Sequence, residues 1–136
     1  MALHIRPFEA ADTAALVEIL SNNGQYDYPE VEGPESMKRA AACPAVVFLV
    51  AEEDSRPVAL VRGIYDGARA LIHLLSVHPD YQRRGIGREL VREINREFHR
   101  RGAPGAVVTA TERSAEFWRK EGFARMPVFL MLTDFD

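Results

Sequence analysis

The sequence has one cysteine, no long apolar run and no excess of basic residues. Cys43 cannot form a disulfide within the chain, and because it stands before Pro44 we expect it to be structural. No apolar run approaches the roughly 18 residues of a membrane span. The first twenty residues mix charges with apolar side chains, unlike a secretory signal peptide. These absences predict a cytoplasmic protein without a membrane segment.

Acidic residues outnumber basic ones, 20 to 17, which gives a formal net charge of -3. A general basic surface for nucleic acid is therefore not expected, and any anion site must be local. The four histidines and the cysteine show neither CxxC nor HExxH spacing, so we expect no metal. With 136 residues, 47% of them hydrophobic, the chain suits one globular domain over residues 1–136.

Short β-branched runs alternate with segments of helical spacing, which predicts a mixed α/β fold. Three consecutive apolar runs, separated by the turns EDSR and DGAR, favour adjacent antiparallel strands. The expected elements are a strand at 3–8, a helix at 10–20, a loop at 22–35, a short helix at 36–42, strands at 45–53, 57–65 and 70–77, a helix after residue 85, a strand at 105–110, a helix at 114–123 and a strand at 127–132.

The helix after residue 85 has two distinct faces. Apolar residues recur at helical spacing on one face, and arginines recur at every fourth position on another. Glutamates lie three residues before three of these arginines, a spacing typical of ion pairs on a solvated helix. Nucleic-acid binding through the arginine row is therefore the weakest of the functional hypotheses.

The stretch VHPDYQRRGIGREL, residues 77–90, leads from a strand into this helix. The first turn of a helix leaves N–H groups unpaired and carries partial positive charge, so it attracts anions. Gly85 and Gly87 carry no side chain to keep a phosphate away, and Gln82, Arg83 and Arg84 add donors at the rim. The stretch therefore predicts a pyrophosphate site. It is not a P-loop, because the pattern GxxxxGK[ST] is absent. It is not the dinucleotide-binding pattern GxGxxG either, because Leu90 stands where that pattern has its third glycine.

The chain resembles the GCN5-related N-acetyltransferases (GNAT family), whose hallmark is [QR]xxGx[GA] between the fourth strand and the next helix. Gln82, Gly85 and Gly87 fill that pattern, and EFWRKEGF resembles the family's FYxxxGF segment. The order of elements agrees from residue 3 to about 133. The YDG sequence before the fourth strand is similar to the turn found in a small bacterial subgroup of single-domain members.

The resemblance implies the GNAT acyl-CoA N-acyltransferase fold: a mostly antiparallel twisted sheet, flanked by helices, whose fourth and fifth strands splay apart. Acetyl-CoA would be the cosubstrate, with its pantetheine arm between those strands like an added strand. Carried over by position, the cofactor-binding residues are Leu75, Val77, Gln82, Arg83, Arg84, Gly85, Ile86, Gly87, Arg88, Thr111 and Trp118.

The reaction that the family implies is direct attack of an amine on the thioester, which requires a neutral nucleophile. An alkyl amine has a pKa of roughly 10, so a base must take its proton at neutral pH. His73 is the leading candidate, because some family members use a histidine on this strand. A half-buried strand histidine without a catalytic role is equally compatible with the sequence. Glu112 is a further candidate, and His78 lies in the loop, where it is less well placed.

Two positions depart from the family pattern. Trp118 stands where a tyrosine often protonates the leaving thiolate, and an indole N–H is not a usable acid. Thr111 stands where an asparagine is frequent. Ser114 or water would then have to supply the proton, or catalysis would be weak. Core packing is the simpler role for Trp118.

In this fold the connection between the first two helices borders the acceptor cleft, and here it is acidic and aromatic. Tyr26, Asp27, Tyr28, Glu30 and Glu32 would favour a cationic amine through charge and cation–π contact, although a solvated loop fits the same residues. We therefore expect an N-acetyltransferase acting on a primary amine of a small molecule or protein. The alternative is a non-catalytic acyl-CoA-binding or regulatory module, and the family also allows a homodimer.

Overall fold

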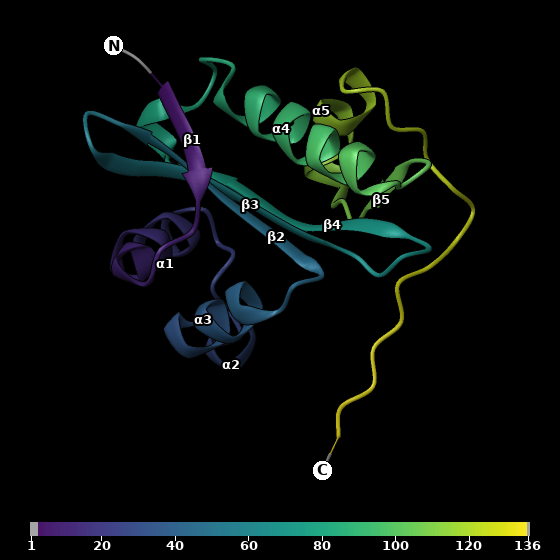
Figure 1. The fold of residues 1–136 in the computed structure, drawn as a ribbon, viewed down its shortest axis with the longest axis horizontal. Helices are drawn as coiled ribbons and strands as arrows, with labels where there is room; N and C mark the ends of the chain where they lie inside the picture. The colour runs from purple at the N-terminus through teal and green to yellow at the C-terminus, as the bar shows by residue number, and fades with distance from the viewer. Residues whose placement is uncertain (1–2, 136) are drawn as a thin grey trace.

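The computed structural model describes residues 3–135, and Figure 1 shows its arrangement. From β1 to α5 the strands and helices follow the order that the apolar pattern predicts, apart from the additional helix α2. The strands are β1 (Leu3–Pro7), β2 (Val46–Glu53), β3 (Arg56–Tyr65), β4 (Ala70–Val77) and β5 (Ala106–Val108). The α-helices are α1 (Thr13–Asn22), α2 (Pro29–Glu32), α3 (Pro34–Ala42), α4 (Ile86–Arg101) and α5 (Ala115–Lys120), with short 3-10 turns η1 (Ala10–Asp12), η2 (Pro79–Tyr81) and η3 (Glu112–Ser114).

The five strands form one sheet in the order β1-β2-β3-β4-β5. The first three pairings are antiparallel, and β4 pairs with β5 in parallel. The β2–β3 hairpin turns through Asp54 and Ser55, both at positive φ (54° and 63°), the backbone of a two-residue hairpin turn whose twist matches the strands. The expected run of three adjacent antiparallel strands is confirmed.

Helices cover both faces of the sheet (Figure 1). One core lies between the sheet and the apolar face of α4, where Leu90, Ile94 and Phe98 are buried, and it continues to Trp118 on α5. The other core lies under α1 and α3, where Leu16, Leu20 and Met37 are buried. The apolar stripe of α4 was predicted from its spacing, and the helix buries that face.

Two segments differ from the sequence expectation. The loop expected at 22–35 contains the short helix α2. The strand expected at 127–132 is wrong: this segment forms no strand, and Phe129 is 91% exposed. Figure 1 shows it as an extended chain leading away from the sheet. A strand requires a hydrogen-bonded neighbour as well as apolar residues, and within residues 3–135 this segment has none. Among the described helices, none has both the length and the apolar character needed to cross a bilayer.

Candidate functional site

Strands β4 and β5 part halfway along β4. Their parallel register has three pairs and ends at Ile72 opposite Val108, although β4 continues to residue 77. The backbone N–H of His78 donates to Val58 O at 2.8 Å, so His78 faces β3 with its backbone polar groups. Because this orientation alternates along an antiparallel strand, the backbone N–H and C=O groups of Leu75 and Val77 point away from β3. The second half of β4 therefore presents an open backbone edge where β5 has diverged.

Side-chain amides cover two carbonyl groups of this edge. Gln25 Nε2 donates to Leu75 O at 3.2 Å, and Asn23 Nδ2 donates to Val77 O at 2.8 Å. The buried Ser76 hydroxyl joins both amides, accepting from Asn23 at 2.8 Å and donating to Gln25 Oε1 at 2.5 Å. These three residues were not predicted as part of the site, because contacts between positions about fifty residues apart leave no periodic signal in the sequence. The polar run SNNGQ after the first helix was the only hint.

A β-bulge sets the direction of His73. Arg62 of β3 lies opposite Leu74 and Gly63 lies opposite Ile72, so His73 is the extra residue on β4. Its side chain lines a pocket on the face covered by α2 and α3, beside the point where β5 leaves. Partial burial lowers the pKa of His73 below its ordinary 6.5, and the positive charge of Arg62 lowers it further, against the opposing effect of Glu32. His73 is therefore neutral at pH 7.

The pocket beside His73 has a volume of about 460 Å³. Its wall contains an ion pair in which Arg62 Nη2 lies 3.0 Å from Glu32 Oε1, with both side chains largely buried. The Arg62 guanidinium also lies 5.8 Å from the centre of the Phe48 ring. The remaining lining comes from α2, α3 and β2, namely Val31, Ser36, Ala40 and Val46.

The loop between β4 and α4 ends at a left-handed glycine. Gly85, at φ 82°, is the N-cap of α4, and among residues 3–135 no side chain caps the first N–H groups of that helix. Arg83 also has positive φ, 66°. Among the described residues, a Cβ on Gly85 would meet nothing within 4 Å, so the space beside this N-cap is open. The helix N-terminus therefore offers unpaired donors and partial positive charge to an anion, as the sequence predicts.

Gly87 has a different role from the one inferred from the sequence. Its Cβ would point at Phe117, 3.5 Å away, and at Val77, 3.6 Å away, rather than into the space before the helix N-terminus. The lack of a side chain at Gly87 therefore widens the slot between β4 and α5. Of the two glycines, Gly85 is the one with a left-handed conformation, at the N-cap of α4.

The residues at the rim of the anion site make local contacts. Gln82 Nε2 donates to Val77 O at 3.0 Å, and so ties the loop to the end of β4. The Arg84 guanidinium lies 4.9 Å from the centre of the Tyr81 ring, and Arg88 approaches Glu121 at 3.9 Å. Arg83, Arg84 and Arg88 are exposed, whereas Ile86 points into the core. The loop and the first turn of α4 thus bring three cationic side chains together in a chain that is acidic overall.

The candidates that follow β5 share one turn and interact mainly with one another. Ser114 N–H donates to Thr111 Oγ1 at 3.2 Å, and the Ser114 hydroxyl donates to Thr111 O at 3.2 Å. Glu112 is exposed and pairs with Arg125 at 2.5 Å. The structure therefore groups Thr111, Glu112 and Ser114 together, while His73 belongs to the pocket on the α2–α3 face.

Trp118 lies in the core. It is 6% exposed and makes edge-to-face contacts with Phe117 and Phe123, at centroid distances of 5.1 and 5.3 Å. His78 is also buried, and its Nδ1 accepts from Asp80 N–H at 3.0 Å. Core packing accounts for the position of Trp118, and capping of η2 accounts for that of His78.

Of the acidic and aromatic residues expected to bind substrate in the 22–35 segment, only Glu32 lines the pocket among the described residues. Tyr26 packs against the core under α1, whereas Asp27, Tyr28 and Glu30 are exposed. Glu32, the third acidic residue expected to favour a cationic amine, turns inward to Arg62. The acidic side chain that reaches the pocket is therefore the one at the end of α2.

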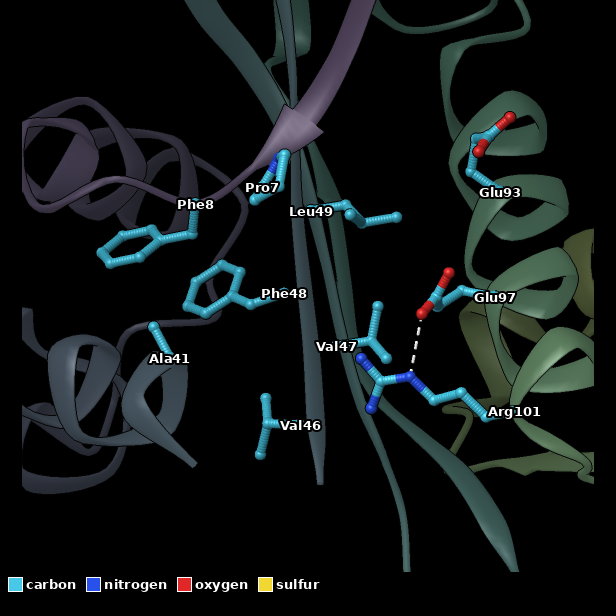
Figure 2. Close-up of a pocket in the computed structure, with 10 residues that line it drawn as sticks. All are labelled: Pro7, Phe8, Ala41, Val46, Val47, Phe48, Leu49, Glu93, Glu97 and Arg101. Atoms are coloured by element: carbon cyan, nitrogen blue, oxygen red, sulfur yellow. Dashed lines mark hydrogen bonds and ion pairs between the residues drawn. The ribbon is translucent and has the colours of Figure 1, made fainter. Parts of the chain in front are cut away.

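A second hollow, of about 290 Å³, lies at the opposite edge of the sheet (Figure 2). There β1 ends at Pro7 and leaves the beginning of β2 without a neighbour on that side. Its charged residues are already paired, since Arg101 Nε lies 2.8 Å from Glu97, and Arg100 and Arg101 lower the pKa of that carboxyl to about 2. This hollow is separate from the edge where β4 and β5 diverge.

Comparison with known proteins agrees with this geometry. The model of the acetyltransferase (GNAT) domain matches residues 44–125. An acetyltransferase of Sodalis glossinidius is 41% identical over 58 residues, 43% of this chain and 41% of that protein. One of Photorhabdus laumondii is 32% identical over 84 residues, 62% of this chain and 59% of that protein. The chain thus spans about half the length of the curated relatives it matches.

A solved structure extends the agreement to the whole fold. The PaiA N-acetyltransferase of Thermoplasma acidophilum, solved in complex with coenzyme A, superposes with a TM-score of 0.81 at 20% identity, covering 95% of this chain and 94% of that one. The likeness shows that the two chains share this mixed α/β fold. Because the domain model matches more than half of the sequence, this chain belongs to the GNAT acetyltransferase family. The resemblance and the fold class predicted from the sequence are confirmed.

Proposed function

We propose that the protein is an N-acetyltransferase that moves the acetyl group of acetyl-CoA to a primary amine of a small molecule or protein. The observation that carries the proposal is the position of the uncapped α4 N-terminus next to the open edge of β4. The helix N-terminus suits a pyrophosphate, and the open strand edge suits an extended chain that contains amide groups. Coenzyme A contains both groups.

The residues present fit the coenzyme. The N–H groups of residues 83–88 and the arginines of that loop would hold the pyrophosphate, and the backbone of Leu75 and Val77 would pair with pantetheine. The amides of Asn23 and Gln25 already hydrogen-bond the carbonyls of this edge, so bound pantetheine would compete with them there. Gly87 keeps the slot between Val77 and Phe117 clear of a side chain.

Acetyl-CoA supplies the activated acyl group, and the protein's task is to position and deprotonate the amine. The amine nitrogen bonds to the thioester carbonyl carbon, the carbon–sulfur bond breaks, and the products are an N-acetyl amine and the coenzyme A thiol. The ammonium gives one proton to His73, whose neutral form is favoured by its lowered pKa, and the nitrogen gives its second proton to water as the amide forms. The thiolate takes its proton from water, since a thiol pKa of roughly 8.5 makes it a tolerable leaving group.

The proposal is tested by incubating the purified protein with acetyl-CoA and a panel of primary amines, following thiol release and the mass of the acetylated amine. We expect amine-dependent turnover that Gly85→Glu abolishes, because a carboxylate would occupy the anion site. Acetyl-CoA binding without turnover for any amine would favour a non-catalytic acyl-CoA-binding module. Absence of binding would contradict both functions.

A further inference from the structure

The pocket beside His73 contains an ion pair that is incompletely satisfied. Arg62 lies in the middle of β3 and is 9% exposed. A guanidinium has five N–H donors, yet among residues 3–135 its one hydrogen-bond partner is Glu32 Oε1, at 3.0 Å. Buried arginines usually have more of their donors engaged, because a desolvated charge is costly unless it is well hydrogen-bonded.

The free donors of Arg62 are not sealed in the core. Within the described part of the chain, Asn95 Oδ1 is the one fully buried side-chain polar atom without a partner, so each unpaired Arg62 nitrogen keeps some accessible surface. Arg62 is itself part of the wall of the 460 Å³ pocket. The guanidinium therefore offers hydrogen bonds to whatever enters that pocket.

We propose that the pocket binds an acceptor that carries a carboxylate close to its amine, as an amino acid does, with the carboxylate on Arg62 and the amine between Glu32 and His73. This inference rests on the proposed acetyltransferase function and names the substrate class for it. A planar guanidinium with unused donors matches a carboxylate in a two-point contact.

The charges of the pocket favour a zwitterion over a simple ion. A cationic amine without a carboxylate would be repelled by the positive charge of Arg62. A carboxylate without an amine would be repelled by the negative charge of Glu32. A molecule with both groups complements both side chains, which already lie 3.0 Å apart. His73 on the same wall is placed to accept a proton from the amine.

The pocket also suits a small apolar side chain. Val31, Ala40 and Val46 line it beside the ion pair. Its volume of about 460 Å³ falls in the range of small-molecule sites. Leucine is therefore a suitable probe, and it has two matched partners: 3-methylbutylamine, which lacks the carboxylate, and 4-methylpentanoate, which lacks the amine.

The test is an NMR titration of the full chain with these three probes, with and without coenzyme A. Leucine should bind at least ~10-fold more tightly than either partner, because losing a hydrogen-bonded charge leaves Arg62 or Glu32 unpaired. Arg62→Gln should remove the advantage over the amine, and Arg62→Lys should reduce it. Glu32→Gln should remove the advantage over the acid. Arg96→Gln, on the solvent face of α4, is the matched control and should change nothing.

Equal or tighter binding of 3-methylbutylamine, no binding of leucine, or an unchanged preference in folded Arg62→Gln and Arg62→Lys would overturn the inference. Thiol release from acetyl-CoA separates this result from the proposed function. Turnover of the amine without preference for leucine would leave the acetyltransferase proposal standing and remove the substrate class. Leucine binding dependent on Arg62, without thiol release, would support the pocket and contradict the activity.

Discussion

Gln82 reaches back to Val77: its Nε2 donates to the Val77 carbonyl at 3.0 Å and to Asn23 Oδ1 at 3.3 Å. The residue that opens the family's glycine motif thus fixes the loop before α4 to the open end of β4. It links the anion site at Gly85 to the edge where β5 diverges.

Replacing Gln82 with Glu should weaken acetyl-CoA binding. Glu keeps the shape but has no N–H, so the contact with Val77 O becomes a repulsion between two oxygens. A negative charge also enters the loop that should receive a pyrophosphate. We expect calorimetry to show a rise in the Kd for acetyl-CoA of at least ~10-fold, because one hydrogen bond is lost and a charge that repels the pyrophosphate is added. An unchanged Kd would show that Gln82 does not position this loop.

The two motif glycines should differ in their effect on stability. Gly85 is left-handed at φ 82°, so Gly85→Ala should lower the free energy of unfolding by about 1 kcal/mol. Gly87 lies in the helix, and its Cβ would make an ordinary 3.5 Å contact, so Gly87→Ala should be neutral or stabilising by up to about 1 kcal/mol. Denaturant unfolding measures both, with Gly105→Ala, at an open position, as control. Equal losses at Gly85 and Gly87 would contradict these separate roles.

The pH dependence of turnover should report His73. Because burial and Arg62 lower its pKa, His73 is deprotonated at pH 7, and kcat/KM should fall only as the pH drops below 6.5. His73→Gln should lower the plateau at least ~100-fold, a typical contribution of a general base, and remove this limb. His99→Gln, an exposed histidine on α4, should keep the native profile. An acidic limb that survives in His73→Gln would assign the base to another group.

The N-terminal strand should make the protein sensitive to acid. Burial raises the pKa of Asp12, but the two-point contact with Arg6, at 2.8 and 2.9 Å, and the hydrogen bond from Glu9 N–H together outweigh it and leave that pKa below 3.8. The resulting stability is present above the unfolded pKa and is lost as the pH falls through the folded one. Asp12→Asn should therefore destabilise by about 1–3 kcal/mol at pH 7 and by less below pH 3.8. A constant difference across that range would contradict the contact.

The C-terminal segment should contribute little to stability. Phe129 and Leu130 are 91% and 82% exposed, so changing both to Ser should alter the free energy of unfolding by less than about 0.5 kcal/mol. Phe98→Ala, in the core under α4, should cost about 3–5 kcal/mol. A loss above about 1 kcal/mol in the Phe129 and Leu130 variant would indicate that residues 127–132 pair with the sheet after all.

Local features of the fold could be read from the sequence. The strand at 70–77 was placed at its observed bounds, because β-branched runs between turn residues depend on nearby positions. The helix at Gly85 and its apolar face followed from spacing and from glycine. The strand at 127–132 failed because β-propensity is met only when a second strand supplies hydrogen bonds.

The polar part of the site could not be read in this way. The Arg62–Glu32 pair, the bulge at His73 and the amides of Asn23 and Gln25 all depend on side chains meeting across the fold. Glu32 differs from Glu30 only in the direction it faces at the end of a short helix. Charge in the 22–35 segment was visible in the sequence, but which carboxylate turns inward was not.

The central claim, that the slot between β4 and β5 with the α4 N-terminus binds acetyl-CoA, is tested most directly by calorimetric titration of the native chain and of an Arg84→Glu and Gly85→Glu double variant, with Arg96→Gln as control. We predict micromolar binding by the native and control proteins and none by the double variant. Absence of binding to the folded native chain, or equal binding by the double variant, would contradict the claim.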